Sequence, residues 1–142
     1  MRRLKSERGT AILETALTLP LLLLVSVSIF EFGRAYQTWQ VLTNASREAA
    51  RVSILVASTD SDVVAAARNY MTGGSLANAG TADVQVERSV AFGGGATASR
   101  VTINYPFNFI VLNPVIRLVQ AGSTTGQGTL TMSAAALMRN ES

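Results

Sequence analysis

The chain begins with a short polar segment, continues as a long apolar run, and then becomes amphipathic. Residues 10–30 contain one charged side chain, Glu14, and the stretch from Thr15 to Phe30 contains none. As an α-helix, a run of this length would extend ~31 Å, which is about the thickness of a bilayer core. The pattern therefore predicts a transmembrane helix over residues 10–30.

Two other interpretations of the apolar run are weaker. A buried core helix would have to be covered on every side, and the chain that follows is too short for that. A cleaved secretory signal would need small residues at a cleavage site after the run. The sequence at that place is IFEFGRAYQ, which offers no small-x-small site.

After the apolar run, apolar residues recur every three or four positions, which is the period of one helical face. This stripe consists of Phe32, Tyr36, Trp39, Leu42, Ala45, Ala49, Val52 and Val56. It predicts that the helix continues over residues 31–57 as an amphipathic stem, making one helix of ~70 Å with the span. Tyr36 and Trp39 suit membrane-interface anchors, but core contacts are favoured for aromatic residues at this spacing.

Residues 58–142 predict a small α+β head. Asp60 or Asp62 can cap a short helix in DVVAAARNYM, which ends at Gly73-Gly74. The alternating segments ADVQVERSVAF and RVTINYPF flank a glycine-rich loop and predict a hairpin. VIRLVQ predicts a short helical turn, and TLTMSAAALMR a third strand. The fold class is therefore α+β: a long N-terminal helix, a short second helix, and an antiparallel sheet of about three strands that receives the apolar face of the stem.

Composition and charge narrow the possible functions. The chain of 142 residues has no cysteine and no histidine, so the commonest metal ligands and the commonest general base are missing. The net charge of +3 belongs to the leader, residues 1–9, where four basic residues face one acidic residue. These basic residues are Arg2, Arg3, Lys5 and Arg8. The rest of the chain is neutral, so no nucleic-acid partner is expected, and the basic leader predicts a cytoplasmic N-terminus and a periplasmic head.

No catalytic or metal-binding motif stands out. Asp60, Asp62 and Asp83 lack the spacing of a calcium loop, and no Lys-Ser/Thr follows the glycine-rich loop at residues 93–95. No serine has a plausible base. We therefore expect no enzyme activity, no metal and no cofactor, and the charged strand residues Glu87, Arg88 and Arg100 are interpreted as solvated.

Glu14 is the most informative charge, because it is the fifth residue after Gly9. A charge in hydrocarbon costs roughly 2.5–3.5 kcal/mol. A cut after Gly9 would create an ammonium on Thr10 that could pair with Glu14 of the same chain or of a neighbour. An intermolecular pair would fix the register of a helical bundle. Spacing alone leaves open the alternative that Glu14 snorkels to the interface near the helix N-terminus.

Pro20 lies inside the predicted span. It has no amide proton, so the carbonyl of Ala16 loses its helical donor and the helix is expected to kink or loosen there. Pro20 is then either a tolerated membrane proline or a hinge used in assembly. The sequence leaves both interpretations open.

The N-terminal residues also resemble a known family. RGTAILETALTLPLLLL is similar to a class III, type IV-pilin-like leader, with a basic stretch, a glycine and a glutamate at the fifth position beyond it. Together with FEFGRAY and NASREAAR, the pattern resembles the TadE/TadG-like pseudopilins of tight-adherence (Flp pilus) systems. TadE-like members fit better, because TadG-like members often carry an additional domain. The resemblance implies a type IV-pilin-like fold.

The resemblance implies a structural role. A prepilin peptidase would cut between Gly9 and Thr10. The product would be a minor pseudopilin or assembly factor that works with the major Flp pilin, other pseudopilins and the inner-membrane assembly platform. It would be a single-pass protein of the bacterial inner membrane that supports adherence and biofilm formation. The alternatives are an uncleaved, signal-anchored periplasmic scaffold or binding component of a secretion machine and, less favoured, a membrane-anchored enzyme.

Overall fold

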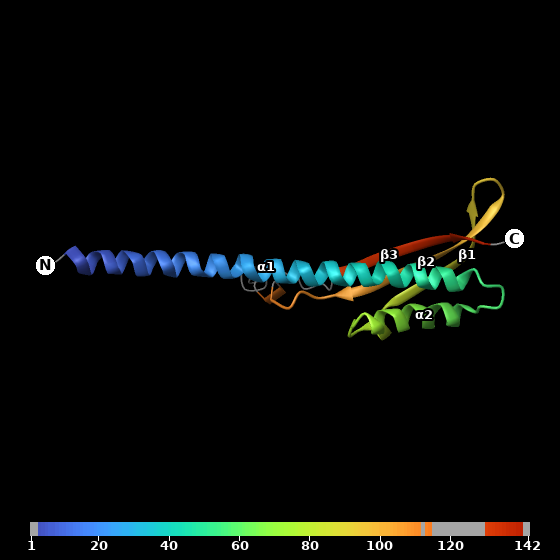
Figure 1. Cartoon of the computed structure of the whole chain (residues 1–142), viewed down its shortest axis with the longest axis horizontal. Helices are drawn as coiled ribbons and strands as arrows, with labels where there is room; N and C mark the ends of the chain where they lie inside the picture. The colour runs from blue at the N-terminus through green and yellow to red at the C-terminus, as the bar shows by residue number, and fades with distance from the viewer. Residues whose placement is uncertain (1–2, 112, 115–129, 141–142) are drawn as a thin grey trace, which may run out of the picture. The chain divides into compact units, whose positions relative to one another are not determined.

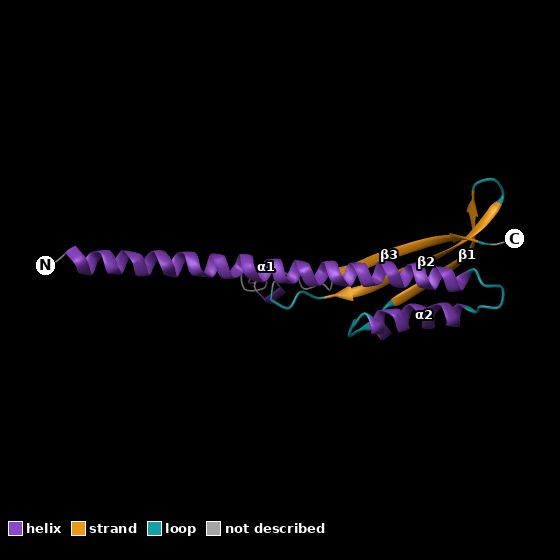
Figure 2. Ribbon diagram, in the orientation of Figure 1, coloured by secondary structure: helices purple, strands orange, loops and turns teal. Residues whose placement is uncertain are grey.

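The computed structural model describes residues 3–111, 113–114 and 130–140. Its elements are α1 (Arg3–Ser53), α2 (Asp60–Gly73), the short 3₁₀ helix η1 (Ala79–Thr81), β1 (Asp83–Phe92), β2 (Ala96–Phe107) and β3 (Leu130–Arg139) (Figures 1 and 2). This confirms the α+β class. The chain forms two compact units: unit 1 joins the chain up to Arg34 with the segment that starts at Phe109, and unit 2 holds Ala35–Asn108 and β3. The helical turn expected at residues 115–120 lies outside the described residues.

The long helix α1 is continuous over 51 residues, and Pro20 does not interrupt it. It ends at Ser53, so the prediction that it would reach Ala57 was wrong. After Ser53 the backbone tightens into turns, because the N–H of Leu55 donates to the carbonyl of Val52 at 3.1 Å. The sequence gives little warning of this end, since apolar residues continue beyond it.

The buried face of α1 in unit 2 differs from the predicted stripe. Its buried side chains are Ala35, Thr38, Leu42, Ala45, Ser46, Ala49, Ala50 and Ser53. Tyr36 and Trp39 are exposed, and their rings contact each other with centroids 6.2 Å apart, so the prediction that they are core residues was wrong. Small side chains leave room for neighbouring elements to approach the helix closely, whereas an aromatic ring would hold them apart.

The second helix begins with a capping box. Thr59 is the N-cap: its hydroxyl accepts from the N–H of Asp62 at 3.3 Å, and the Asp62 carboxylate accepts from the N–H of Thr59 at 2.9 Å. The prediction of an aspartate cap was therefore wrong, although Asp62 supplies the reciprocal bond. At the other end, a side chain on Gly74 would lie 2.5 Å from a methyl carbon of Val41. The glycine thus lets the end of α2 approach α1.

The sheet has the strand order β1-β2-β3 and is antiparallel throughout. The predicted hairpin and third strand are confirmed. Gly94 and Gly95 adopt positive φ angles of 75° and 81°, which glycine tolerates best. Side chains at alternate positions of the central strand β2 are buried, namely Val101, Ile103, Tyr105 and Phe107. With the buried residues of α1 and α2, they form the core of unit 2.

One irregularity interrupts the first strand. The pairing of β1 with β2 shifts between Glu87 and Val90, and Ser89 has a φ of 63°. Strict alternation from Val84 to Val90 was therefore a wrong prediction. The bulge inserts one extra residue into β1 and re-aims its side chains.

Candidate membrane and assembly sites on the long helix

The apolar run of α1 is uncovered. Its large side chains are exposed, with Leu17 at 77% and Ile29 at 70%, and none of the most apolar window is buried. The helix is long and apolar enough to cross a membrane. Monomeric soluble proteins rarely expose a continuous apolar surface of this kind. The run therefore requires lipid or other helices around it.

Four hydroxyl groups of the run, those of Thr15, Thr18, Ser26 and Ser28, are satisfied within the helix itself. Each donates to the carbonyl four residues earlier: Thr15 to Ala11 at 2.8 Å, Thr18 to Glu14 at 2.9 Å, Ser26 to Leu22 at 2.9 Å and Ser28 to Leu24 at 2.7 Å. Polar groups in hydrocarbon must find partners inside the protein. These four hydroxyls thus present no unpaired donor to lipid.

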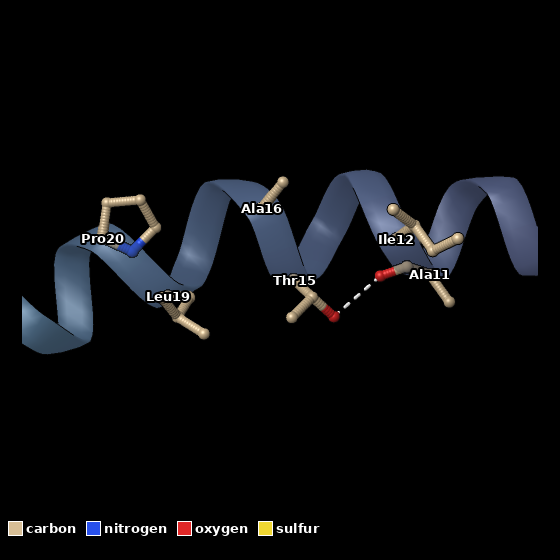
Figure 3. A pocket seen from close by; sticks show the side chains of 6 residues that line it. All are labelled: Ala11, Ile12, Thr15, Ala16, Leu19 and Pro20. Atoms are coloured by element: carbon tan, nitrogen blue, oxygen red, sulfur yellow. Dashed lines mark hydrogen bonds between the residues drawn. The ribbon is translucent and has the colours of Figure 1, made fainter.

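Pro20 closes a groove on the surface of α1. The groove is lined by Ala11, Ile12, Thr15, Ala16, Leu19 and Pro20 (Figure 3). Figure 3 shows the ribbon continuing through Pro20 without a break, and the dashed bond from Thr15 to the Ala11 carbonyl. The use of Pro20 as a hinge stays a prediction.

The expected processing site lies inside α1. The backbone of Arg3, Lys5 and Arg8 is helical, as is that of Gly9 and Thr10, and Arg2 lies outside the described residues. A Cβ atom added to Gly9 would meet no atom within 4 Å. The fold therefore does not explain why this position is a glycine.

Glu14 is exposed on α1. Its backbone carbonyl accepts the hydroxyl of Thr18. Among the side chains that the structure describes, none bonds to the Glu14 carboxylate. The structure thus leaves this charge available to a group outside the chain or to the Thr10 ammonium that cleavage would create.

Glu31 is a site that the sequence analysis missed. Its side chain is fully buried in unit 1. One carboxylate oxygen, Oε1, accepts the backbone N–H groups of Ile110 and Val111, each at 2.7 Å. The other oxygen, Oε2, accepts from Nη2 of Arg34 at 3.0 Å. The carboxylate thus fastens a segment almost eighty residues away to the side of α1.

The contacts of Glu31 with Ile110, Val111 and Arg34, which we call the Glu31 socket, determine the ionisation of its carboxyl. Burial alone would raise the pKa of its carboxyl, but the N–H of Val111, the guanidinium of Arg34 and the N–H of Ile110 together lower it below its ordinary value. Next to it, the rings of Phe32 and Phe109 meet edge to face with centroids 6.3 Å apart. Glu31 is therefore ionised, and its carboxylate holds the segment at Ile110 and Val111 against α1.

A signal for Glu31 is present in the sequence. The buried positions of α1 continue backwards from Leu42 through Thr38 and Ala35 to Glu31 at spacings of four, three and four. A search that considers apolar residues alone does not detect this series of positions, because the series includes the polar residues Thr38 and Glu31. A polar residue in phase with the buried face, immediately after an apolar run, is the pattern that would have identified it.

Arg88 is the second residue whose role the sequence analysis misjudged. Its Nε donates to Asp60 at 2.7 Å, and Nη1 and Nη2 donate to the carbonyls of Ser53 and Ser58, both at 3.0 Å. Arg88 thus satisfies a carbonyl in the last turn of α1 and joins it to the start of α2. The interpretation of Arg88 as a solvated charge was wrong. The pair of Arg100 with Glu87, at 3.3 Å, is exposed on the strands.

The described residues contain no group of three or more histidine, cysteine, aspartate or glutamate side chains that could hold a metal ion. The model of the TadE-like protein family matches residues 9–51. This match confirms the TadE-like resemblance, and it begins at Gly9 and ends in the last turn of α1. Comparison with curated proteins and with solved structures finds no match.

Proposed function

We propose that this protein is a minor pseudopilin or assembly factor of a tight-adherence (Flp) pilus and supports adherence and biofilm formation. The TadE-like match points to such pilus systems. One observation carries the finer proposal: the match starts at Gly9, at the end of the basic leader, and continues along a helix whose apolar run is uncovered. A leader, a glycine and a bare apolar helix are the parts that a pilin-like subunit needs.

The first partner in this proposal is a prepilin peptidase that cuts between Gly9 and Thr10. Gly9 has open space around it, so its lack of a side chain is better explained by recognition than by folding. Because glycine weakens a helix by roughly 1 kcal/mol relative to alanine, it also makes local opening at the scissile bond easier. The basic residues Arg2, Arg3, Lys5 and Arg8 keep this end of the chain in the cytoplasm.

The second partner is the bilayer of the inner membrane, with the N-terminus inside and unit 2 on the periplasmic side. The exposed apolar run and its internally bonded hydroxyls support this placement. The remaining partners are the major Flp pilin, other pseudopilins and the assembly platform. Glu14 supports a contact with a neighbouring subunit, since no described side chain of its own chain bonds to it, and the Thr10 ammonium of that subunit has the matching charge.

The second candidate function is an uncleaved, signal-anchored scaffold of a secretion machine. One observation favours it: α1 passes through Gly9 without interruption, so the bond between Gly9 and Thr10 lies within regular helix and would have to open locally before cleavage. In this alternative, the leader stays attached and the basic residues serve only topology.

Two matched glycine variants separate the candidates. Gly9 and Gly33 both lie in α1, and a Cβ atom added to either one would meet no atom within 4 Å. Gly9→Leu and Gly33→Leu therefore add the same bulk to the same helix at positions where an added Cβ is unobstructed. We expect Gly9→Leu to leave the precursor uncut in cells that contain the peptidase, and Gly33→Leu to be cut like the unchanged protein.

Cleavage is followed by the intact mass of the membrane-extracted protein. The same cells without the peptidase provide the uncut reference. If the unchanged protein keeps its leader as completely as it does in the cells without the peptidase, the uncleaved scaffold is the correct function, and if both the unchanged protein and Gly9→Leu lose the leader, Gly9 is not what the peptidase recognises. If Gly33→Leu also stays uncut, the effect arises from helix stiffness and not from recognition at Gly9.

A further inference from the structure

A short apolar segment is fastened to α1 where the apolar run ends. It consists of Phe109, Ile110 and Val111, which belong to unit 1 together with the first part of α1. The side chain of Ile110 is 61% exposed and that of Val111 is 39% exposed. The backbone N–H groups of Ile110 and Val111 donate to Glu31 on the helix, whereas the side chains of these two residues are exposed.

The position of the segment along α1 is fixed by its bonds. Glu31 directly follows Phe30, which is the last residue of the apolar run, and Ile29 and Phe30 are themselves 70% and 66% exposed. The 2.7 Å bonds from Ile110 and Val111 to Glu31 therefore place the segment beside the end of the run. Its exposed apolar side chains therefore lie at the level of α1 where the run that requires lipid ends.

The bonding pattern is the one that non-helical backbone needs near lipid. An unpaired N–H costs several kcal/mol in hydrocarbon, so irregular backbone occurs at membrane depth only where the protein satisfies it. Here both N–H groups donate to a fully buried carboxylate. The charge of that carboxylate is balanced by Arg34, which lies one turn farther from the run and keeps 30% of its side chain exposed.

We propose that Ile110 and Val111 insert into the bilayer beside α1, so that unit 1 holds the membrane at two points. The occupant of this apolar patch is the lipid surface itself. Glu31 is the positioning residue, because its carboxylate turns the backbone inward and the side chains outward. A second point of insertion also fixes the rotation of α1 about its own axis, which a single helix leaves free. This inference rests on the membrane placement in the proposed function.

Nitroxide labels test the insertion directly. The chain has no cysteine, so each single-cysteine variant carries its label at one known position. Ile110→Cys and Val111→Cys report on the segment. Leu22→Cys, in the middle of the run, is the reference for lipid, and Val56→Cys, which is apolar, fully exposed and outside the run, is the reference for water.

The full chain is reconstituted in vesicles of phosphatidylethanolamine and phosphatidylglycerol. Collision rates of each label are then measured with oxygen, which concentrates in lipid, and with a water-soluble nickel chelate. We expect the label at Ile110 to collide more often with oxygen and less often with the chelate than the label at Val56 does, as the label at Leu22 should. Its depth in the bilayer should be smaller than that of the label at Leu22. Val111→Cys should behave in the same way, and it guards against a local disturbance caused by one label.

Each other outcome contradicts a defined part of the account. If both segment labels collide with the chelate as freely as Val56 while Leu22 lies in lipid, the segment is in water and the insertion is wrong. If the segment labels are shielded from both reagents, the patch is covered by protein and not by lipid, which also overturns the proposal. If Leu22 itself is accessible to the chelate, the membrane placement in the proposed function has failed.

Discussion

Glu14 and Glu31 are two carboxylates on the same helix in opposite circumstances. Glu14 is exposed, and no described side chain bonds to its carboxylate. Glu31 is fully buried and binds two backbone N–H groups and Arg34. A carboxylate whose partners lie in its own chain fixes the fold. A carboxylate without such partners, in an apolar surface, is suited to a partner outside the chain.

The same contrast separates the two parts of α1. Up to Phe30 its large side chains are exposed, and four of its hydroxyls donate to carbonyls of the same helix. This part is therefore suited to an apolar environment. From Ala35 to Ser53 its small residues are buried, so that part is built for the core of unit 2. One helix therefore meets two surroundings, and the change falls at Glu31.

The largest expected effect is on Glu14. In the pseudopilin that we propose, Glu14→Leu would remove the partner of a neighbour's Thr10 ammonium. Leaving one half of a buried pair uncompensated costs roughly 3–5 kcal/mol. This lowers association with pilin partners by about a hundredfold or more, since each 1.4 kcal/mol is tenfold. Cross-linking yield and pilus counts measure the loss, while cleavage and membrane insertion should stay intact.

The matched control for Glu14 is Thr15→Leu, which makes the adjacent exposed position equally apolar. The Thr15 hydroxyl bonds only to the carbonyl of Ala11, so we expect normal assembly from this variant. Normal cross-linking and piliation in Glu14→Leu would show that the carboxylate only snorkels to the interface.

The contacts at the C-terminal end of α1 can be tested by removing the side chain of Arg88. Arg88→Ala removes three bonds that join the end of α1 to the start of α2. Hydrogen bonds of charged groups contribute about 1.5–3 kcal/mol, so the free energy of unfolding of unit 2 should fall by about that amount. Urea unfolding followed by Trp39 fluorescence measures it. Arg100→Ala, which breaks only an exposed strand pair, should change it little, and an equal loss in both variants would contradict the role of Arg88.

Loss of the hydrogen bonds to Glu31 should destabilise only the segment that they hold, which contains Ile110 and Val111. Glu31→Ala leaves the N–H groups of Ile110 and Val111 and the guanidinium of Arg34 without the carboxylate. Unsatisfied buried groups cost about 1–3 kcal/mol, so the free energy of opening at these amides should fall by about that much. Hydrogen exchange of Ile110 and Val111 measures it. Glu48→Ala breaks an exposed ion pair with Arg51 on the same helix and should leave these two amides unchanged.

The smallest effect is the pH dependence of the same socket. The pKa of Glu31 is lowered from its ordinary value of 4.5, so the folded state favours the ionised carboxyl. The stability that this provides is present above 4.5 and is lost as the pH falls through the lower pKa of the folded protein. The amide shifts of Ile110 and Val111 should therefore follow a titration whose midpoint lies below 4.5. A midpoint at or above 4.5 would contradict the socket, and Glu31→Gln should abolish the transition.

The sequence predicted those features that depend on local pattern. The apolar run, α2, the hairpin and β3 each have a periodicity or turn residues of their own, so they could be located without tertiary information. The exposure of Tyr36 and Trp39 could not be predicted, because close packing selects small residues over aromatic ones. The end of α1 could not be predicted either, because apolar residues continue beyond it. Arg88 and Glu31 were missed for a related reason: their partners at Ser53 and Ile110 are 35 and 79 residues away. Glu14 and Gly9 were found from spacing, and their roles remain predictions.

The most direct test of the central claim is the N-terminal sequence and intact mass of the protein from its native membrane. Our account predicts a chain that starts at Thr10, with the leader removed after Gly9 and Glu14 at the fifth position. A native chain that retains Arg2 would contradict it, because no Thr10 ammonium would then exist for Glu14 to pair with. That result would instead identify an uncleaved anchor.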